Sequence, residues 1–236
     1  MITDAVAHAL WLDPGNDLFV CVFPHVAAEA RRRTGRPALA PGPIIDQRFM
    51  DPADRAAGRR ALGLADGEDA AIISTGSWGV GDVVATARRL ARLDGVRPTV
   101  LCGRNERLRS ELSTVDGCVA LGWRDDLPDL FAAAAVLIDN AGGATCIEAF
   151  AAGLPVVSYR PIPGHGRAGV QALDEAGLLT YARNEPALLA AVAQLRRGGP
   201  ERDAQCERAR AIFADDPAVA IESWLRDDTR AVAGTG

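Results

Sequence analysis

A glycine pair, a threonine and a glutamate lie close together in the sequence and could jointly bind a phosphorylated ligand. Gly142 and Gly143 follow an apolar run and precede a helical pattern that contains Thr145 and Glu148. Glycines let a backbone approach a ligand closely, and the N–H groups at the start of a helix attract phosphate oxygens. One carboxylate can accept two hydrogen bonds from a ribose diol. Residues 140–155 therefore predict a nucleotide site, with a diphosphate on the helix start and a ribose on Glu148.

A simpler interpretation treats each of these residues as structural. The glycine pair would then form a tight turn between a strand and a helix, Thr145 would only cap that helix, and Glu148 would respond to the helix dipole. A Gly-Leu-Pro sequence at residues 153–155 ends the helix and leads directly into the next apolar run. The combination of Glu148 with this sequence, at the spacing found here, favours the nucleotide site.

The elements that must hold these residues are short apolar runs that alternate with longer helical patterns. Runs typical of strands lie at residues 18–23, 70–74, 98–102, 118–121, 135–139, 155–159 and 178–181. Helical patterns lie at residues 80–93, 106–112, 127–134, 145–152, 170–176, 185–197, 201–213 and 217–226. This alternation predicts an α/β fold, a Rossmann-like parallel sheet with helices on both faces. Ligands of such sheets bind at the carboxyl ends of the strands, which is where the glycine pair falls.

The composition argues against several classes of function. The net charge is −5 and the pI about 5.3, so the overall field does not attract nucleic acid. The three histidines are scattered and no D-x-D pair occurs, so we expect no metal site. The adjacent acids Asp125 and Asp126 precede a helical pattern and are expected to cap it. No apolar stretch is long enough to span a bilayer, and the N-terminus does not have the pattern of a signal peptide. The five cysteines form no C-x-x-C pair, which favours a reducing, cytoplasmic compartment.

Several longer stretches resemble one family of sugar-transferring enzymes. The stretch AGGATCIEAFAAGLPVVSYRPIPGHG is similar to the donor-binding C-terminal domain of GT-B glycosyltransferases of the family 28 type, which include MurG and the monogalactosyldiacylglycerol (MGDG) synthases. The stretches STGSWGVGD, LCGRNERL and GWRDDLPDLFAAAAVLIDNAGG match further segments of that domain in the same order. TDAVAHALWLDPGND looks like the segment that crosses into it from an N-terminal domain. The resemblance therefore covers nearly the whole chain.

This resemblance implies three parts. Residues 1–66, rich in Pro, Gly and Asp, would be a crossing segment and linker from a missing or truncated N-terminal domain. Residues 67–199 would form the nucleotide-sugar donor-binding Rossmann-like domain, and residues 200–236 the C-terminal helices and tail. The expected architecture is thus a single GT-B C-terminal domain plus an N-terminal crossing segment.

The resemblance also implies roles for individual residues. The diphosphate would bind to Gly142, Gly143, Ala144 and Thr145, and the ribose to Glu148. Trp123 would cover the base, which would pair with the backbone of Arg124. Gly76 and Ser77 would lie near the phosphates, and Arg104 would line the same cleft. Three of them have a simpler alternative: Trp123 as a core or strand-end aromatic, Arg104 as a solvated arginine at a helix start, and Ser77 as a turn residue.

The loop that faces the donor sugar in this family departs from the usual pattern. Related sequences resemble PIPGQE there, followed by an Asn, whereas this chain has His165, Gly166 and Gly169 at those places. His165 keeps one donor and one acceptor, or is an exposed loop residue. The donor sugar is therefore not fixed by the resemblance. The catalytic base is also unidentified, with His8 and His165 as candidates and a structural contact with Trp11 as the alternative for His8.

The implied function is transfer of a hexosyl group from a UDP-sugar, as substrate and without a cofactor, to a lipid or other hydroxyl acceptor. Alternatives are a catalytically inactive nucleotide-sugar binding module and a UDP-sugar epimerase-like enzyme of the same fold. A separate acceptor-domain subunit is a further expected partner. The expected location is cytoplasmic, with peripheral contact to the inner face of the cell membrane left open. A site for anionic lipid headgroups on the arginine run at residues 31–36, or a plain solvated helix end, are both compatible with this location.

Overall fold

A computed structural model describes residues 1–51, 53–74 and 82–233 of the chain. By its contacts the chain forms two compact units, one of Met1–Ile44 with Arg210–Gly236 and one of Ile45–Ala209. The predicted division at residues 66 and 199 stays a prediction.

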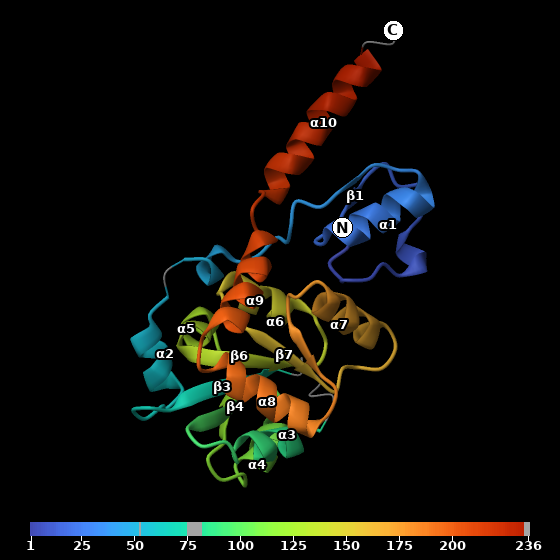
Figure 1. Cartoon of the computed structure of the whole chain (residues 1–236). Coiled ribbons are helices and arrows are strands. Elements are labelled where there is room, and N and C mark those ends of the chain that lie inside the picture. Colours follow the sequence, from blue (N-terminus) through green and yellow to red (C-terminus); the bar gives the residue numbers. More distant parts are fainter. Residues whose placement is uncertain (52, 75–81, 234–236) are drawn as a thin grey trace. The chain divides into compact units, whose positions relative to one another are not determined.

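The second unit is built on one parallel sheet of six strands (Figure 1). Along the sheet the order is β5-β4-β3-β6-β7-β8, and every neighbouring pair is parallel. The strands are β3 (Asp69–Ser74), β4 (Val96–Gly103), β5 (Val119–Gly122), β6 (Ala134–Asp139), β7 (Val156–Tyr159) and β8 (Thr180–Ala182). Since β3 and β6 are fully or almost fully buried, their continuous apolar sequences match a sheet that is covered on both sides.

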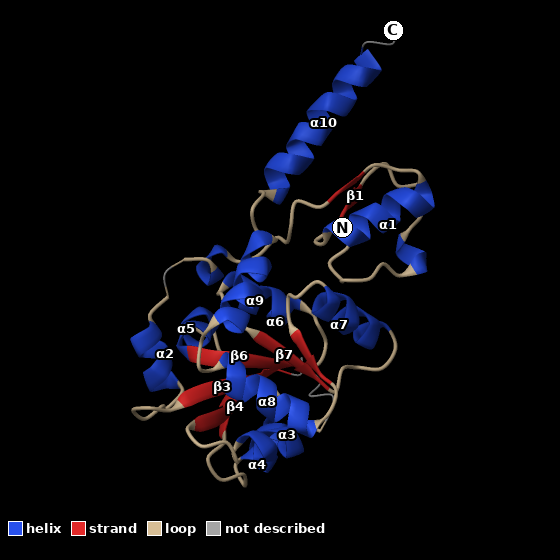
Figure 2. Ribbon diagram, in the orientation of Figure 1, coloured by secondary structure: helices blue, strands red, loops and turns tan. Residues whose placement is uncertain are grey.

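Helices cover both faces of this sheet (Figure 2). One face packs against α3 (Val83–Leu90), α4 (Glu106–Leu112) and α8 (Glu185–Leu195), whose apolar residues share a core with alternate residues of the strands. The other face packs against α5 (Leu127–Ala133), α6 (Ala144–Ala151) and α7 (His165–Glu175). The predicted Rossmann-like fold is therefore confirmed. α7 begins five residues before the predicted start at residue 170, directly after Gly164.

The segment before β3, which the sequence suggested to be linker, contains two helical elements that pack on this unit. These are the 3-10 helix η2 (Gln47–Phe49) and α2 (Arg55–Ala61). Phe49 contacts Phe131 of α5, with ring centres 5.7 Å apart. Gly58 of α2 faces α5 so closely that a Cβ atom there would lie 2.0 Å from the carbonyl oxygen of Asp129. Residues 45–61 are thus firmly attached to the sheet unit through α5.

The first unit contains a small βαβ element. The strands β1 (Phe19–Val20) and β2 (Ala38–Leu39) pair in parallel, and α1 (Pro24–Thr34) connects them. The predicted strand at residues 18–23 is wrong in length, because the chain leaves β1 after two residues and turns into α1 at Pro24. The unit also holds the short 3-10 helix η1 (Ala9–Trp11), the end of α9 (Pro200–Ala211) and α10 (Pro217–Ala233). Asp216 caps α10 through the amide of Ala218 at 2.8 Å.

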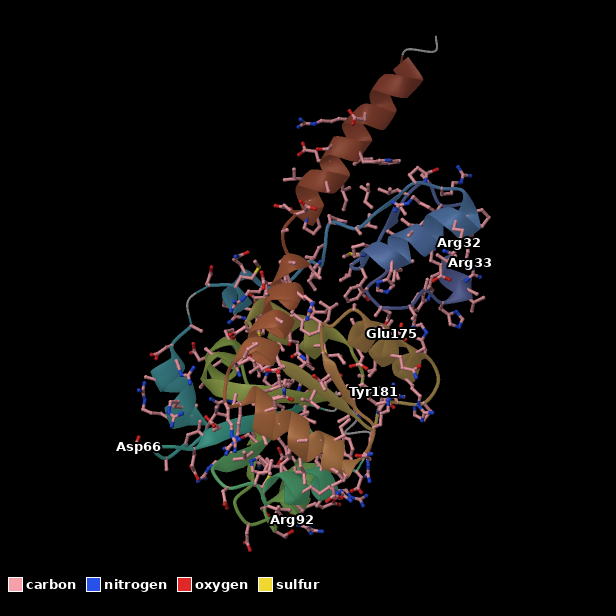
Figure 3. All side chains as sticks on the ribbon, viewed as in Figure 1. Arg32, Arg33, Asp66, Arg92, Glu175 and Tyr181 are labelled. Atoms are coloured by element: carbon pink, nitrogen blue, oxygen red, sulfur yellow. The ribbon has the colours of Figure 1, made fainter. Side chains whose placement is uncertain are left out.

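The arginine run on α1 is largely engaged within its own unit. Arg31 donates to the carbonyl oxygen of Ala38, Arg33 pairs with Glu29 at 3.2 Å, and Arg36 donates to the carbonyl oxygen of Pro14 at 2.6 Å. Arg32 and Arg33 project from the helix (Figure 3). Arg31, Arg33 and Arg36 thus have partners within the unit, and both the solvated helix end and the lipid headgroup site stay predictions. Within the described residues, no helix is both long and apolar enough to cross a membrane.

Candidate nucleotide-sugar site

The predicted site residues gather at one edge of the six-stranded sheet. Because all strands are parallel, their carboxyl ends lie together, and each expected ligand contact follows one of these ends. The residues found at this edge are Arg104 after β4, Trp123 and Arg124 after β5, Gly142, Gly143, Ala144, Thr145 and Glu148 after β6, and His165 and Gly166 after β7. Gly76 and Ser77 lie outside the described residues, and His8 belongs to the first unit. The individual roles of all these residues stay predictions.

The glycine loop after β6 is shaped by the carboxylate of Asp139. Its Oδ2 atom accepts hydrogen bonds from the amides of Ala141 at 2.7 Å and Gly142 at 2.5 Å. Gly142 has φ 64°, a left-handed conformation that favours glycine. A Cβ atom there would also lie 3.3 Å from the side chain of Leu173. The first glycine of the pair is therefore required by the turn, as the structural interpretation predicts.

Asp139 is a buried acid, with 4% of its surface exposed. Burial raises its pKa, and the amides of Gly142 and Ala141 and the thiol of Cys146 act in the opposite direction by hydrogen bonding to the carboxylate. Burial likewise raises the pKa of Cys146 far above 9.0, and the neighbouring Asp139 adds to the shift. The thiol thus serves as a hydrogen-bonding neutral group beneath the loop and is not a nucleophile.

The second glycine leads into the start of α6, where amides are available to a ligand. Gly143 is the N-cap residue, and the first amides that bond into the helix are those of Cys146 and Ile147, both to the carbonyl oxygen of Gly143. Ala144 and Thr145 precede them, so within the described residues their amides point out of the helix start. Thr145 is not the N-cap that the simpler interpretation required, because it lies inside the first turn. It remains a hydroxyl donor beside these amides.

Glu148 lies one turn further along α6. Its spacing from Ala144 and Thr145 places it on the same helix face. The side chain is partly buried, and burial raises its pKa, with the charge of Asp46 as the second cause. A carboxylate with a raised pKa is poorly solvated, so hydroxyl donors of a ligand would stabilise its ionised form.

Asp46 and Arg48 connect the segment before β3 with this site, a link that the sequence did not indicate. Arg48 binds the Asp46 carboxylate through Nη2 at 2.7 Å and through Nε. Its Nη1 donates to the carbonyl oxygen of Asp125 at 3.4 Å. The pair thus lies between α6, which carries Glu148, and the loop after β5.

The loop after β5 presents an exposed indole. Trp123 is 65% exposed, which excludes the core-aromatic alternative. Its Nε1 donates to Asp125 Oδ1 at 3.2 Å, and the guanidinium of Arg104 lies over its ring. Asp126 stands at the N-cap position of α5 but makes no capping hydrogen bond, since its carboxylate binds Arg124 instead. The predicted capping role of this acidic pair is therefore wrong for Asp126.

His165 and Gly166 occupy the first turn of α7 and are partly buried. His8 caps η1 by accepting the amide of Leu10 at 3.2 Å, and its ring centre lies 5.7 Å from that of Trp11. That contact fits the structural alternative for His8.

Two cavities of about 400 Å³ flank this edge of the sheet. One lies at α3 and α4 and is lined in part by Asp82, Asn105 and Arg107. The other lies at η2 and α5 and is lined in part by Arg48 and Asp125. No group of three or more potential metal ligands occurs among the residues that the structure describes.

A family model described as "Glycosyl transferases group 1" matches residues 76–197, which is more than half of the chain. The chain belongs to this glycosyltransferase family. The match covers the glycine loop, α6 and the loop after β5, so the predicted resemblance to glycosyltransferases is confirmed.

Curated relatives of this glycosyltransferase chain include processive diacylglycerol beta-glucosyltransferases. That of Bacillus pumilus is 25% identical over 203 residues, which cover 83% of this chain and 53% of the relative. That of Bacillus mycoides is 23% identical over 240 residues, covering 98% of this chain and 62% of the relative. The chain thus spans between one half and two thirds of the length of these relatives.

Solved structures support the fold. Anabaena HepE in complex with UDP-glucose aligns with a TM-score of 0.61 at 17% identity, covering 91% of this chain and 64% of HepE. Acinetobacter baumannii MurG aligns with a TM-score of 0.56 at 19% identity, covering 89% of this chain and 60% of MurG. The sheet unit therefore has the Rossmann-like fold of these GT-B neighbours.

Proposed function

We propose that this chain binds a UDP-sugar and contributes the donor site for hexosyl transfer to a lipid hydroxyl. The proposal rests on one observation: three groups that could each contact a different part of a nucleotide lie at the same edge of the sheet. The start of α6 offers amides for a diphosphate, Glu148 offers a carboxylate for a ribose, and Trp123 offers an exposed ring for a base. Such a set matches the parts of a nucleoside diphosphate one by one.

Two comparisons support the choice of donor and acceptor. HepE, which has a similar fold, is described in complex with UDP-glucose and with UDP. The Bacillus relatives are named diacylglycerol beta-glucosyltransferases. We therefore favour UDP-glucose as donor and diacylglycerol as acceptor. The Gly-loop amides and α6 would stabilise the negative charge that develops on the departing diphosphate. We propose that the catalytic base comes from elsewhere in the protein, because none of the contacts described at this edge orients a side chain as a base.

Calorimetric titration of the chain with UDP, UDP-glucose, ADP and GDP tests the donor proposal. We expect binding of both uridine compounds and weaker binding of ADP and GDP. Equal affinity for all nucleotides would contradict a base-reading site, and absence of any binding would overturn the proposal as a whole.

Incubation with radiolabelled UDP-glucose and diacylglycerol vesicles tests transfer, with and without a separately expressed acceptor domain from a Bacillus relative. Labelled glycolipid supports the transferase. Donor binding without any turnover under both conditions would instead support a nucleotide-sugar binding module, and a change of sugar configuration in the recovered donor would support an epimerase.

A further inference from the structure

Arg160 has an unusual backbone conformation at the edge of the candidate site. Among the described residues it is the non-glycine residue with a positive φ, at 54°. A bulky side chain disfavours this region, and so does the proline that follows at position 161, which restricts the residue before it to extended conformations. Such a conformation is unfavourable and persists where the surrounding structure imposes it, often at a ligand-binding position.

The side chain of Arg160 bridges the two strands on either side of β6. Arg160 follows β7, and its Nη1 donates to Asp82 Oδ2 at 2.8 Å. Asp82 is the N-cap of α3, in the connection that leaves β3. β6 lies between β3 and β7 in the sheet, so this ion pair passes the carboxyl end of β6, where the glycine loop begins. The amide of Ile162 also donates to the carbonyl oxygen of Asn140 at 3.0 Å, which ties the chain after Arg160 to that loop.

The ion pair is too exposed to account for the strained backbone. The side chains of Arg160 and Asp82 are 42% and 52% exposed, and ion pairs this exposed contribute little to stability. The Arg160 guanidinium also lies over the ring of Tyr159, 5.3 Å from its centre, a contact that is weak at an exposed position. These contacts offset the backbone cost at best. The conformation therefore gives little net stability, and its evident effect is to direct a cation across the glycine loop.

The glycine loop needs such a cation if it binds a diphosphate. The amides of Ala141 and Gly142 are already bonded to Asp139, so the start of α6 offers the ligand a small number of neutral donors. Arg104 is engaged with Trp123, at the β5 end of the sheet. A guanidinium matches the geometry of phosphate oxygens and can bind two at once.

We propose that Arg160 binds the diphosphate of the donor, and that Asp82 holds its guanidinium as a counterion until the ligand replaces it. This inference rests on the proposed function, because it assumes a nucleoside diphosphate on the glycine loop. Exchange of one anionic partner for another keeps Arg160 charged and paired in both states. Binding then breaks the ion pair between Asp82, the N-cap of α3, and Arg160, which follows β7.

Two variants test this exchange with opposite expected effects. Arg160→Gly removes the cation and suits the left-handed backbone, so we expect UDP affinity to fall about tenfold or more while the unfolding temperature stays the same or rises. Asp82→Asn keeps the helix cap and releases the guanidinium, so we expect UDP to bind a few-fold more tightly. Uridine affinity should change in neither variant. A purely structural ion pair would instead lower stability in both variants and leave the ratio of UDP to uridine affinity unchanged, which would overturn the proposal.

Arg183→Gly is the matched control, since Arg183 also follows a strand, β8, and its guanidinium also lies over a tyrosine, 4.8 Å from the ring centre of Tyr181. Tyr181 is labelled in Figure 3. We expect no change in UDP affinity there. If the wild-type chain binds neither UDP nor uridine, the proposed function fails, and titration with inorganic pyrophosphate then decides on Arg160. Pyrophosphate binding that is lost in Arg160→Gly but kept in Arg183→Gly supports the anion site. Equal binding in all three proteins, or none in the wild type, overturns it.

Discussion

The guanidinium carbon of Arg104 lies 5.1 Å from the centre of the Trp123 ring. The two residues follow neighbouring strands, β4 and β5, whose last residues Gly103 and Gly122 are partners in the sheet register. The parallel register thus brings a cation and an exposed ring together at the sheet edge. Together with the hydrogen bond from the Trp123 indole to Asp125, this contact holds the ring in one orientation before any ligand binds.

Replacement of Trp123 by alanine should weaken UDP binding without weakening the fold. Stacking of a base on an aromatic side chain contributes about 1–3 kcal/mol, and a residue that is 65% exposed adds little to the core. Calorimetric titration and thermal unfolding measure the two effects separately. Trp123→Phe is the control and should retain most of the affinity. A large loss of stability in Trp123→Ala would show that the ring is structural.

Replacement of Glu148 by alanine should remove the preference of the site for a ribose over a deoxyribose. Loss of hydrogen bonds to a charged acceptor weakens binding by about 1–3 kcal/mol. The sharper measurement is the ratio of the affinities for UDP and 2′-deoxy-UDP. We expect the wild-type chain to prefer UDP, and the Glu148→Ala variant to bind both alike. An unchanged preference in that variant would place the ribose elsewhere.

The affinity for uridine should depend on pH through Glu148. Burial raises the pKa of this carboxyl above its usual 4.5, and the charge of Asp46 contributes. Only the ionised form accepts both ribose hydrogen bonds, so affinity should fall as the pH is lowered through the raised pKa. Uridine has no phosphate that titrates in this range. Saturation-transfer NMR of the wild-type chain and of Glu148→Gln checks the prediction, since the variant should show no such fall.

The same shift predicts the opposite sign for stability. A carboxyl whose pKa is higher in the folded than in the unfolded state stabilises the fold fully below the unfolded value, and this contribution is lost as the pH rises through the folded value. At neutral pH, Glu148→Gln should therefore unfold at a higher temperature than the wild type. At a pH below the usual pKa of glutamate, the two proteins should unfold at the same temperature. A difference in unfolding temperature that is constant at every pH would argue against ionisation of Glu148 as its cause.

The attachment of α2 to α5 can be tested with a single methyl group. Gly58→Ala places a Cβ 2.0 Å from the Asp129 carbonyl oxygen, so the helices must separate, at a cost of about 1–3 kcal/mol of unfolding free energy. Gly169→Ala is the control, because this glycine lies inside α7 with open space around its Cβ position. There, alanine should stabilise the helix by about 0.5–1 kcal/mol. Chemical denaturation of both variants measures the contrast.

Much of the sheet unit could be predicted because its sequence signals are local. The apolar runs of β3 and β6 are typical of strands buried on both faces, and the glycine pair before a helical pattern marks the loop after β6. Glu148 could be predicted as a candidate site residue from its place after the glycine pair, and Trp123 from the family resemblance; their roles stay predictions. Thr145 was harder to interpret, since its hydroxyl suits an N-cap as well as a ligand contact, and only the bounds of α6 decide between them.

The contacts that were missed depend on residues far apart in the chain. Asp46 and Arg48 lie in a segment with the composition of a linker, and nothing local relates them to Asp125 or Glu148. From the sequence alone, Gly58 would be interpreted as a glycine that weakens its helix. The structure shows that it allows α5 to approach closely. The conformation of Arg160 runs against the preference of a residue before proline, so local rules predict an extended backbone there.

The carboxylate of Asp139 has a consequence for the depth of the site. Towards the amides of Ala141 and Gly142 it does what a phosphate oxygen does in many glycine loops, so an oxyanion of the protein already fills the inner side of this turn. An incoming anion must then approach from the outer side, towards the amides of Ala144 and Thr145. The side chain of Asp139, which would not contact the donor, therefore sets the distance between the donor and the sheet. Because the turn keeps its shape without a ligand, binding would order little of the chain and would lose little conformational entropy.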